Sequence, residues 1–125
     1  MFSDLPSANF GLNYDPSHFI LQRMDPINPL REFQSKLFHL HAKNAVVHPE
    51  KLNEVGIFAV PKAWHRPCIP GGGEVDWARF MARLCEIGYA GPVCIEVEDD
   101  TFGRTLAGRK TAVKVAGDVL RPYFA

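Results

Sequence analysis

The sequence has no excess charge of either sign. Its 14 Lys and Arg residues balance its 14 Asp and Glu residues, so the formal net charge at pH 7 is zero. Proteins that attract nucleic acid or anionic membranes through a general electrostatic field carry a basic excess. We therefore expect neither nucleic acid nor a membrane surface among the partners of this chain.

Long apolar runs and cysteines are also scarce. No stretch reaches the roughly 18 apolar residues typical of a membrane-spanning helix, and Met1 to Phe10 lacks the basic and apolar segments of an export signal. The cysteines Cys68, Cys85 and Cys94 are odd in number and share no close metal-ligand spacing, which favours free, buried thiols in a reducing compartment. The sequence thus predicts a soluble, cytoplasmic protein.

The composition that remains is that of a globular protein. The chain has 125 residues, of which 46% are hydrophobic and 22% charged. These values are typical of one folded domain. We expect residues 1–125 to form a single domain.

Strand-like and helix-like segments alternate along the chain. Alternating apolar and polar residues predict strands at 9–15, 37–42 and 93–98. Helical spacing and end signals predict helices at 17–23, 28–35, 76–87 and 105–120. The segment 43–75, rich in Pro and Gly, is expected to be a long functional loop. Three βα units in series predict parallel strands joined by helical crossovers.

Each predicted strand is apolar on one face and ends in polar residues on the other. A parallel sheet covered by helices on both faces lacks this pattern, whereas a barrel has an outer apolar face and ligands on its inner rim. A complete TIM barrel has eight strands in about 250 residues. The predicted fold class is therefore α/β, a partial (β/α) TIM barrel of about three parallel βα units. Its unpaired sheet edges favour completion by self-association into a homo-oligomer.

An acid or an imidazole lies at the end of each predicted strand, namely Asp15, His41 and Glu96. If the strands lie side by side, these groups converge on one divalent-metal site. Two carboxylates and one imidazole favour Mn²⁺, with Zn²⁺, Mg²⁺ or Co²⁺ as alternatives. A simpler interpretation of Asp15, which precedes Pro16, is the start of a turn.

Five motifs in order resemble the C-terminal part of the xylose-isomerase-like TIM barrels. They are Gly11-Leu12-Asn13-Tyr14-Asp15-Pro16-Ser17-His18, Phe38-His39-Leu40-His41-Ala42-Lys43, Pro70-Gly71-Gly72-Gly73-Glu74-Val75-Asp76-Trp77, Ile87-Gly88-Tyr89 and Ile95-Glu96. This superfamily includes sugar (phosphate) isomerases and epimerases and AP endonuclease family 2. The resemblance implies that the three strands correspond to the sixth, seventh and eighth of a barrel.

The resemblance also implies roles for single residues. Asp15, His41 and Glu96 would be three of four metal ligands, and Glu96 one of two metal-bound glutamates that share the proton transfers of an epimerase. His18 would lie near the substrate, and Arg66 in a loop from which relatives bring a cation to a substrate hydroxyl or phosphate. The second glutamate belongs on an earlier strand, so the isolated chain is expected to be incomplete for catalysis.

Several residues near these positions have more than one interpretation. Lys43 either contacts substrate or pairs with a carboxylate, and Arg66 is also compatible with an ordinary surface position. We expect His39 to be a hydrogen-bonded core histidine and Trp77 to be core. The acidic run Glu98-Asp99-Asp100 is expected to be solvated. Asn44 stands where relatives usually carry Asp, which would weaken the support of His41.

Two classes of function follow. The first is a metal-binding relative of the sugar (phosphate) isomerases and epimerases, acting on a small sugar or sugar phosphate. The alternative is a non-enzymatic remnant or binding module that retains the half-barrel fold. A DNA-repair nuclease of the same barrel type is disfavoured by the neutral charge.

Overall fold

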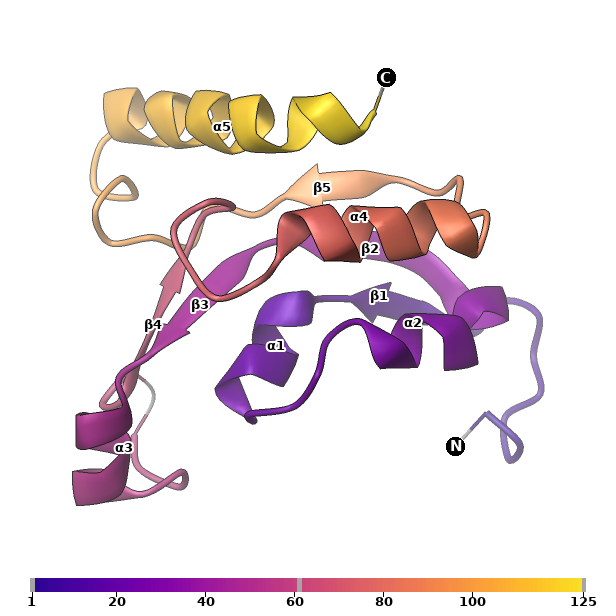
Figure 1. Cartoon of the computed structure of the whole chain (residues 1–125), viewed down its shortest axis with the longest axis horizontal. Helices are drawn as coiled ribbons and strands as arrows, with labels where there is room; N and C mark the ends of the chain where they lie inside the picture. The colour runs from indigo at the N-terminus through magenta and orange to yellow at the C-terminus, as the bar shows by residue number, and fades with distance from the viewer. Residues whose placement is uncertain (1, 61, 125) are drawn as a thin grey trace.

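The computed structural model describes residues 2–60 and 62–124 (Figure 1). The strands are β1 (Leu12–Tyr14), β2 (Leu37–Ala42), β3 (Asn44–Val47), β4 (His65–Cys68) and β5 (Val93–Ile95). The helices are α1 (Pro16–Leu21), α2 (Asn28–Glu32), α3 (Pro49–Val55), α4 (Trp77–Glu86) and α5 (Leu106–Leu120), with 3₁₀ turns at Gln34–Lys36 and Arg121–Tyr123. Within the described residues, no helix has both the length and the apolar character required to span a bilayer.

The main sheet is parallel, as the sequence predicts. Its strand order is β1-β2-β5, with Tyr14 paired with Leu40 and His41 paired with Cys94. Strand β2 is thus central, and β1 and β5 each have one neighbour in this sheet. The three predicted strands lie side by side with their carboxyl ends at one edge, which brings the residues that follow them together.

The helices that follow the strands cover the outer face of this sheet (Figure 1). The core between them combines sheet residues such as Leu40 and Ala42 with Leu30 of α2, Phe80 of α4 and Leu120 of α5. A smaller apolar cluster joins α5 to the end of β5 through Ala112 and Ala116. Trp77 is buried in the main core, which confirms its predicted structural role.

Helix ends follow the signals in the sequence. The side chain of Asp76 accepts a hydrogen bond from the backbone N–H of Arg79 and begins α4, and Thr105 caps α5 in the same way. Gly88 lies just beyond α4 with φ of 68°, a conformation that glycine adopts without a steric penalty. Local capping chemistry therefore fixes the two longest helices to within a residue of their predicted bounds.

A register irregularity between β1 and β2 changes the burial of one predicted core residue. Leu12 pairs with Leu37 but Asn13 pairs with His39, so Phe38 is an extra residue in β2. Phe38 is 44% exposed, whereas Leu37 is buried. Strict alternation along residues 37–42 would place Phe38 on the face of Leu40, but this alternation does not hold across the bulge.

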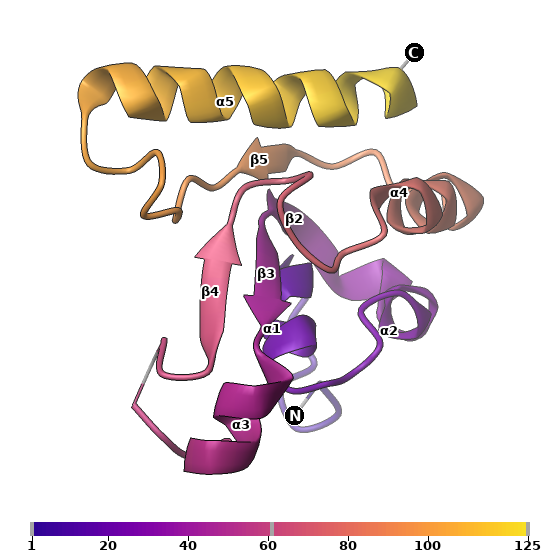
Figure 2. The same ribbon diagram turned by 60° about the vertical axis from the view of Figure 1, so that its left-hand side comes forward.

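The predicted long loop 43–75 contains regular structure that the sequence analysis missed. Strand β3 follows β2 after Lys43 alone, and it pairs with β4 in an antiparallel hairpin. Figure 2 shows this hairpin leaving the main sheet, with α3 at its far end. Both strands are only four residues long, and the alternation that reveals longer strands is not visible in them.

The three cysteines are free thiols, as predicted, but only one of them is buried. Cys68 is fully buried, whereas Cys85 on α4 and Cys94 on β5 are exposed. Burial raises the pKa of the Cys68 thiol to about 11. The expectation that all three pack in the interior was wrong, because Cys94 alternates with Val93 and Ile95, which take the helix-covered face of β5.

Candidate metal centre

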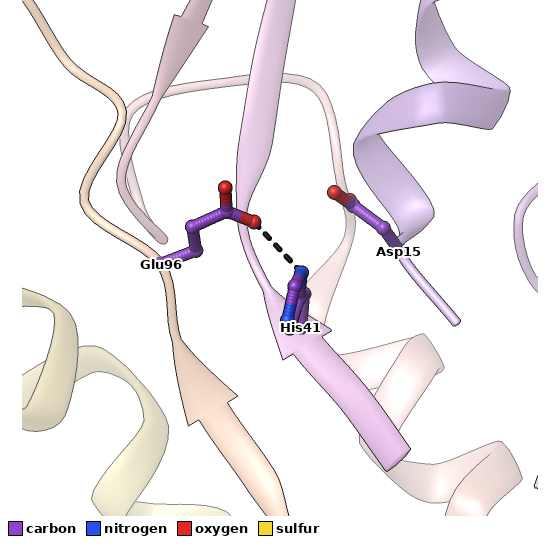
Figure 3. A group of neighbouring side chains, drawn as sticks. All are labelled: Asp15, His41 and Glu96. Atoms are coloured by element: carbon purple, nitrogen blue, oxygen red, sulfur yellow. Dashed lines mark ion pairs between the residues drawn. The ribbon is translucent and has the colours of Figure 1, made fainter. Parts of the chain in front are cut away.

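Side chains at the carboxyl ends of the three parallel strands form a cluster of Asp15, His41 and Glu96 (Figure 3). Asp15 follows β1, His41 is the penultimate residue of β2, and Glu96 follows β5. One ligand atom from each lies within 4.8 Å of both of the others. The convergence expected from the sequence is therefore present in the structure.

Asp15 serves both as the start of a turn and as part of this cluster. Its Oδ1 accepts hydrogen bonds from the backbone N–H and the hydroxyl of Ser17, at 2.8 and 2.7 Å, and so caps α1. Its Oδ2 lies 3.3 Å from Nε2 of His18 and 3.6 Å from Nζ of Lys43. The cap fixes the carboxylate with one oxygen directed toward the cluster.

His41 lies between a carboxylate and an amide. Its Nδ1 is 2.8 Å from Oε2 of Glu96, and its Nε2 is 3.1 Å from Nδ2 of Asn13. Asn13 Oδ1 in turn lies 2.9 Å from Nδ1 of His39. His39 is hydrogen-bonded as predicted, but it is half-buried on the inner face of the sheet and does not belong to the core.

Lys43 is buried at the same edge and pairs with carboxylates, one of its two predicted roles. Its Nζ lies 2.6 Å from Oε2 of Glu98, 3.5 Å from Oε1 of Glu96 and 3.6 Å from Oδ2 of Asp15. Burial favours the neutral amine, but the hydrogen bond with Glu98 and the charges of these carboxylates outweigh it, so the pKa of Lys43 lies above its ordinary value. The chain thus places one cation among three anions.

The cluster opens into a cavity of about 870 Å³. Its apolar wall consists of Phe2, Leu12, Tyr14, Phe19 and Phe33, and its polar wall includes Asn13, Asp15, His18, His41, Lys43 and Glu96. Three residues were predicted to contact substrate. Two of them, His18 and Lys43, line this cavity, and Arg66 is not among its described lining residues. An apolar wall facing a few convergent polar groups is the usual form of a small-molecule site.

Arg66 lies in β4, and its NH1 nitrogen is 3.7 Å from Oδ2 of Asp99. The carboxylate of Asp99 is buried and accepts hydrogen bonds from the backbone N–H groups of Ile69 and Thr101. The prediction of a solvated acidic run was therefore wrong for Asp99, whereas Glu98 and Asp100 are exposed. Asp99 ties the hairpin to the segment after β5, and Glu98 pairs with Lys43.

Asn44 supports the chain around β3 and not His41. It is fully buried, and its Oδ1 accepts from the backbone N–H groups of Ala45 and Val75. Within the described part of the chain, its Nδ2 has no hydrogen-bond partner. The expectation that this position supports His41 is not met, because its hydrogen bonds go to the backbone on either side of the hairpin.

Sequence reasoning missed the contacts that Asn13 and Glu98 make in this region. Asn13 bridges two histidines, and Glu98 is the nearest partner of Lys43. The alternation of residues 9–15 already places Asn13 on the same strand face as Asp15. Strand parity was thus a signal that could have identified Asn13.

Comparison with known proteins agrees with this geometry. The model of the family described as "Xylose isomerase-like TIM barrel" matches residues 1–123. The chain belongs to this family. A solved structure of a xylose isomerase domain protein from Planctomyces limnophilus has a TM-score of 0.77 and 30% identity, over 98% of this chain and 40% of that one.

Two curated sequences show how much of the xylose isomerase-like barrel this chain represents. The protein YfiH of Bacillus subtilis is 30% identical over 112 residues, covering 83% of this chain and 36% of YfiH. The inosose dehydratase of Clostridium tetani is 28% identical over 100 residues, covering 71% of this chain and 30% of that enzyme. The chain thus spans about a third of the length of these relatives.

Proposed function

We propose that Asp15, His41 and Glu96 bind a divalent metal ion, with Mn²⁺ as the first choice and Zn²⁺, Mg²⁺ or Co²⁺ as alternatives. The supporting observation is that one ligand atom of each residue lies within 4.8 Å of the other two. Two carboxylates and one imidazole suit these cations. The cap on Asp15 and the bridge from Asn13 to His41 hold two of the ligands in place.

We further propose that this site belongs to a sugar (phosphate) isomerase- or epimerase-like protein. Glu96 would move a proton at the carbon next to a substrate carbonyl, since its carboxylate faces the cavity. His18 and Lys43 would contact the substrate from the cavity wall, and Arg66 from the hairpin. A bound divalent cation would act as a Lewis acid toward substrate oxygens.

The relatives support a proposal about the first chemical step of the reaction and not about one particular overall reaction. The name inosose dehydratase denotes loss of water from that enzyme's substrate. Elimination of water beside a carbonyl and isomerisation of a sugar both begin by removing a proton next to the carbonyl group. Proton abstraction from a small polyhydroxylated carbonyl compound is therefore the part of the activity that we assign to Glu96.

A complete reaction of this type requires more than these residues supply. Among the described residues, the cluster offers three candidate ligands, and we assign proton transfer to only one of them, Glu96. We propose that a fourth ligand and a second base come from outside residues 1–125, which act as the C-terminal part of the barrel. The second candidate function, a binding module without catalysis, is supported by this same incompleteness.

We propose that the chain associates with itself, in the cytoplasm. Strands β1 and β5 each have one neighbour in the main sheet, and Cys94 is exposed on the face away from the helices. Open edges of this kind normally pair or are covered. Size-exclusion chromatography with light scattering tests the proposal, and a stable, monodisperse monomer at micromolar concentration would refute it.

Isothermal titration with Mn²⁺ and with Zn²⁺ tests the metal site. We expect binding by the wild type and at least about tenfold weaker binding by Glu96→Ala, since ligand loss costs more than loss of a supporting residue. Glu86→Ala is the control, because Glu86 is a carboxylate on the outer helix α4 paired with Arg83. No detectable binding by the wild type, or equal affinities of all three proteins, would contradict the proposal.

A further inference from the structure

A continuous line of polar contacts crosses the inner face of the sheet from β5 to β1 and back to β2. It runs from Glu96 to Nδ1 of His41 at 2.8 Å, from Nε2 of His41 to Asn13 Nδ2 at 3.1 Å, and from Asn13 Oδ1 to Nδ1 of His39 at 2.9 Å. His39 and His41 also contact edge-on, with ring centroids 5.4 Å apart. Four side chains are thereby linked in sequence.

The direction of each hydrogen bond in this line follows from donor and acceptor chemistry. An ionised carboxylate only accepts, so Nδ1 of His41 carries the hydrogen that faces Glu96. When the ring carries this one hydrogen, Nε2 is an acceptor, and the Asn13 amide presents its NH₂ group to it. The Asn13 oxygen therefore faces His39, whose Nδ1 must donate.

A metal ion shared with Glu96 requires the opposite arrangement. Nδ1 is the His41 nitrogen on the side of Glu96 (Figure 3), and a metal ligand nitrogen cannot carry a hydrogen. The ring proton of His41 must then lie on Nε2, which becomes a donor toward Asn13. The amide satisfies a donor only through its oxygen, so its NH₂ group turns toward His39.

We propose that Asn13 is a positioning residue whose amide reverses when metal binds, linking the tautomer of His41 to that of His39. This inference rests on the proposed metal site. Each imidazole holds one proton before and after the change, and only the nitrogen that carries it differs. His39 donates through Nδ1 in the metal-free protein and accepts there in the loaded protein.

The residue type and its surroundings suit this role. A primary amide carries a donor and an acceptor of nearly the same size, so a half-turn about its last bond exchanges the two. Asn13 is exposed at the open cavity, and the described structure gives its side chain no hydrogen bonds other than those to the two histidines. The amide can therefore turn without breaking a packing contact in the core.

The test is ¹⁵N NMR of the histidine rings in the full chain, with and without Zn²⁺, which is diamagnetic. It is run near pH 8, above the ordinary imidazole pKa of about 6.5. Without metal, we expect the proton on Nδ1 of both His41 and His39. With saturating Zn²⁺, both rings should show the proton on Nε2, while exposed His48 at the start of α3 stays unchanged.

We call this coupling of the His41 and His39 tautomers through Asn13 the relay. Two variants, Asn13→Asp and Asn13→Ala, distinguish it from a merely structural role of Asn13. A carboxylate at position 13 accepts from both rings, so we expect Zn²⁺ to bind to Asn13→Asp with His39 fixed as the Nδ1–H tautomer. Asn13→Ala should lose about tenfold in Zn²⁺ affinity, and its His39 should not respond to metal.

Two results would overturn the relay alone. The first is that His41 of the metal-free wild type carries its proton on Nε2. The second is that Zn²⁺ changes the tautomer of His41 but leaves the tautomer of His39 unchanged. Zn²⁺ without effect on either ring and without heat of binding would instead overturn the proposed metal site, and the metal-linked half of the relay with it.

Discussion

Nζ of Lys43 lies 2.6 Å from Oε2 of Glu98, in an ion pair between a buried cation and a half-exposed anion. The same nitrogen is 3.5 to 3.6 Å from Glu96 and Asp15, two of the three proposed metal ligands. In the absence of metal, Lys43 is therefore the positive charge that balances the carboxylates at the carboxyl edge of the sheet.

Replacing Lys43 with Met should destabilise the metal-free protein by about 1 to 3 kcal/mol, because it removes the counter-charge of buried Asp15 and of the partly exposed Glu96 and Glu98. Saturating Mn²⁺ should then raise the melting temperature of Lys43→Met by more than that of the wild type, since the metal restores the missing charge. Thermal and urea unfolding with and without Mn²⁺ measure both effects.

Lys114→Met is the matched control for Lys43→Met. Lys114 forms an equally short ion pair with Asp118, at 2.6 Å, but both side chains are mostly exposed on α5. Its loss should destabilise the protein much less than the loss of Lys43 and should not change the response to Mn²⁺. Equal losses in the two variants would show that Lys43 is not a buried counter-ion.

Glu98→Gln should make the stability of the protein less dependent on acid pH. The hydrogen bond from Lys43 holds the pKa of Glu98 below its ordinary value of 4.5. A lowered folded-state pKa contributes stability that is present above 4.5 and is lost as pH falls through the folded-state value. Urea unfolding between about pH 6 and pH 3 should show a shallower decline for Glu98→Gln than for the wild type. Parallel declines would contradict the pairing.

Asp99 and Asp100 are adjacent carboxylates whose replacement should change stability by very different amounts. Asp99 is buried and accepts two backbone hydrogen bonds, so Asp99→Ala should cost about 2 to 3 kcal/mol. Asp100 is exposed and forms one long ion pair with Lys62 at 3.6 Å, so Asp100→Ala should change stability by less than about 0.5 kcal/mol. Urea unfolding of both variants measures the difference, and similar values for the two would count against the tie between the hairpin and β5.

Gly73→Ala and Gly117→Ala should shift stability in opposite directions. A Cβ at Gly73 would lie 2.5 Å from the carbonyl oxygen of Ala45 and from Oδ1 of Asn44, so the loop must move and lose stability. A Cβ at Gly117, inside α5, has no described atom beyond its own stretch of helix within 4 Å and should stabilise the helix by about 0.5 to 1 kcal/mol. Thermal unfolding distinguishes the two signs, and a stabilised Gly73→Ala would contradict the close approach.

The sequence predicted the centre of this structure better than its periphery. Strand β2 has the predicted bounds, and the ends of α4 and α5 lie within a residue of prediction, because alternation and capping are local properties. The hairpin of β3 and β4 was missed, and so was the burial of Asp99. Those features depend on contacts between segments 18 to 30 residues apart, from the pairing of Val47 with His65 to the bond from Ile69 to Asp99.

The sequence by itself identified the three proposed ligand residues and predicted the parallel arrangement of their strands. Each of Asp15, His41 and Glu96 is at or near the end of an apolar, alternating segment, and parallel strands bring such ends to one edge. Only the tertiary structure decided what surrounds these three residues. The bulge at Phe38, the buried place of Lys43 and the bridge by Asn13 each depend on the pairing of distant segments, which no local pattern encodes.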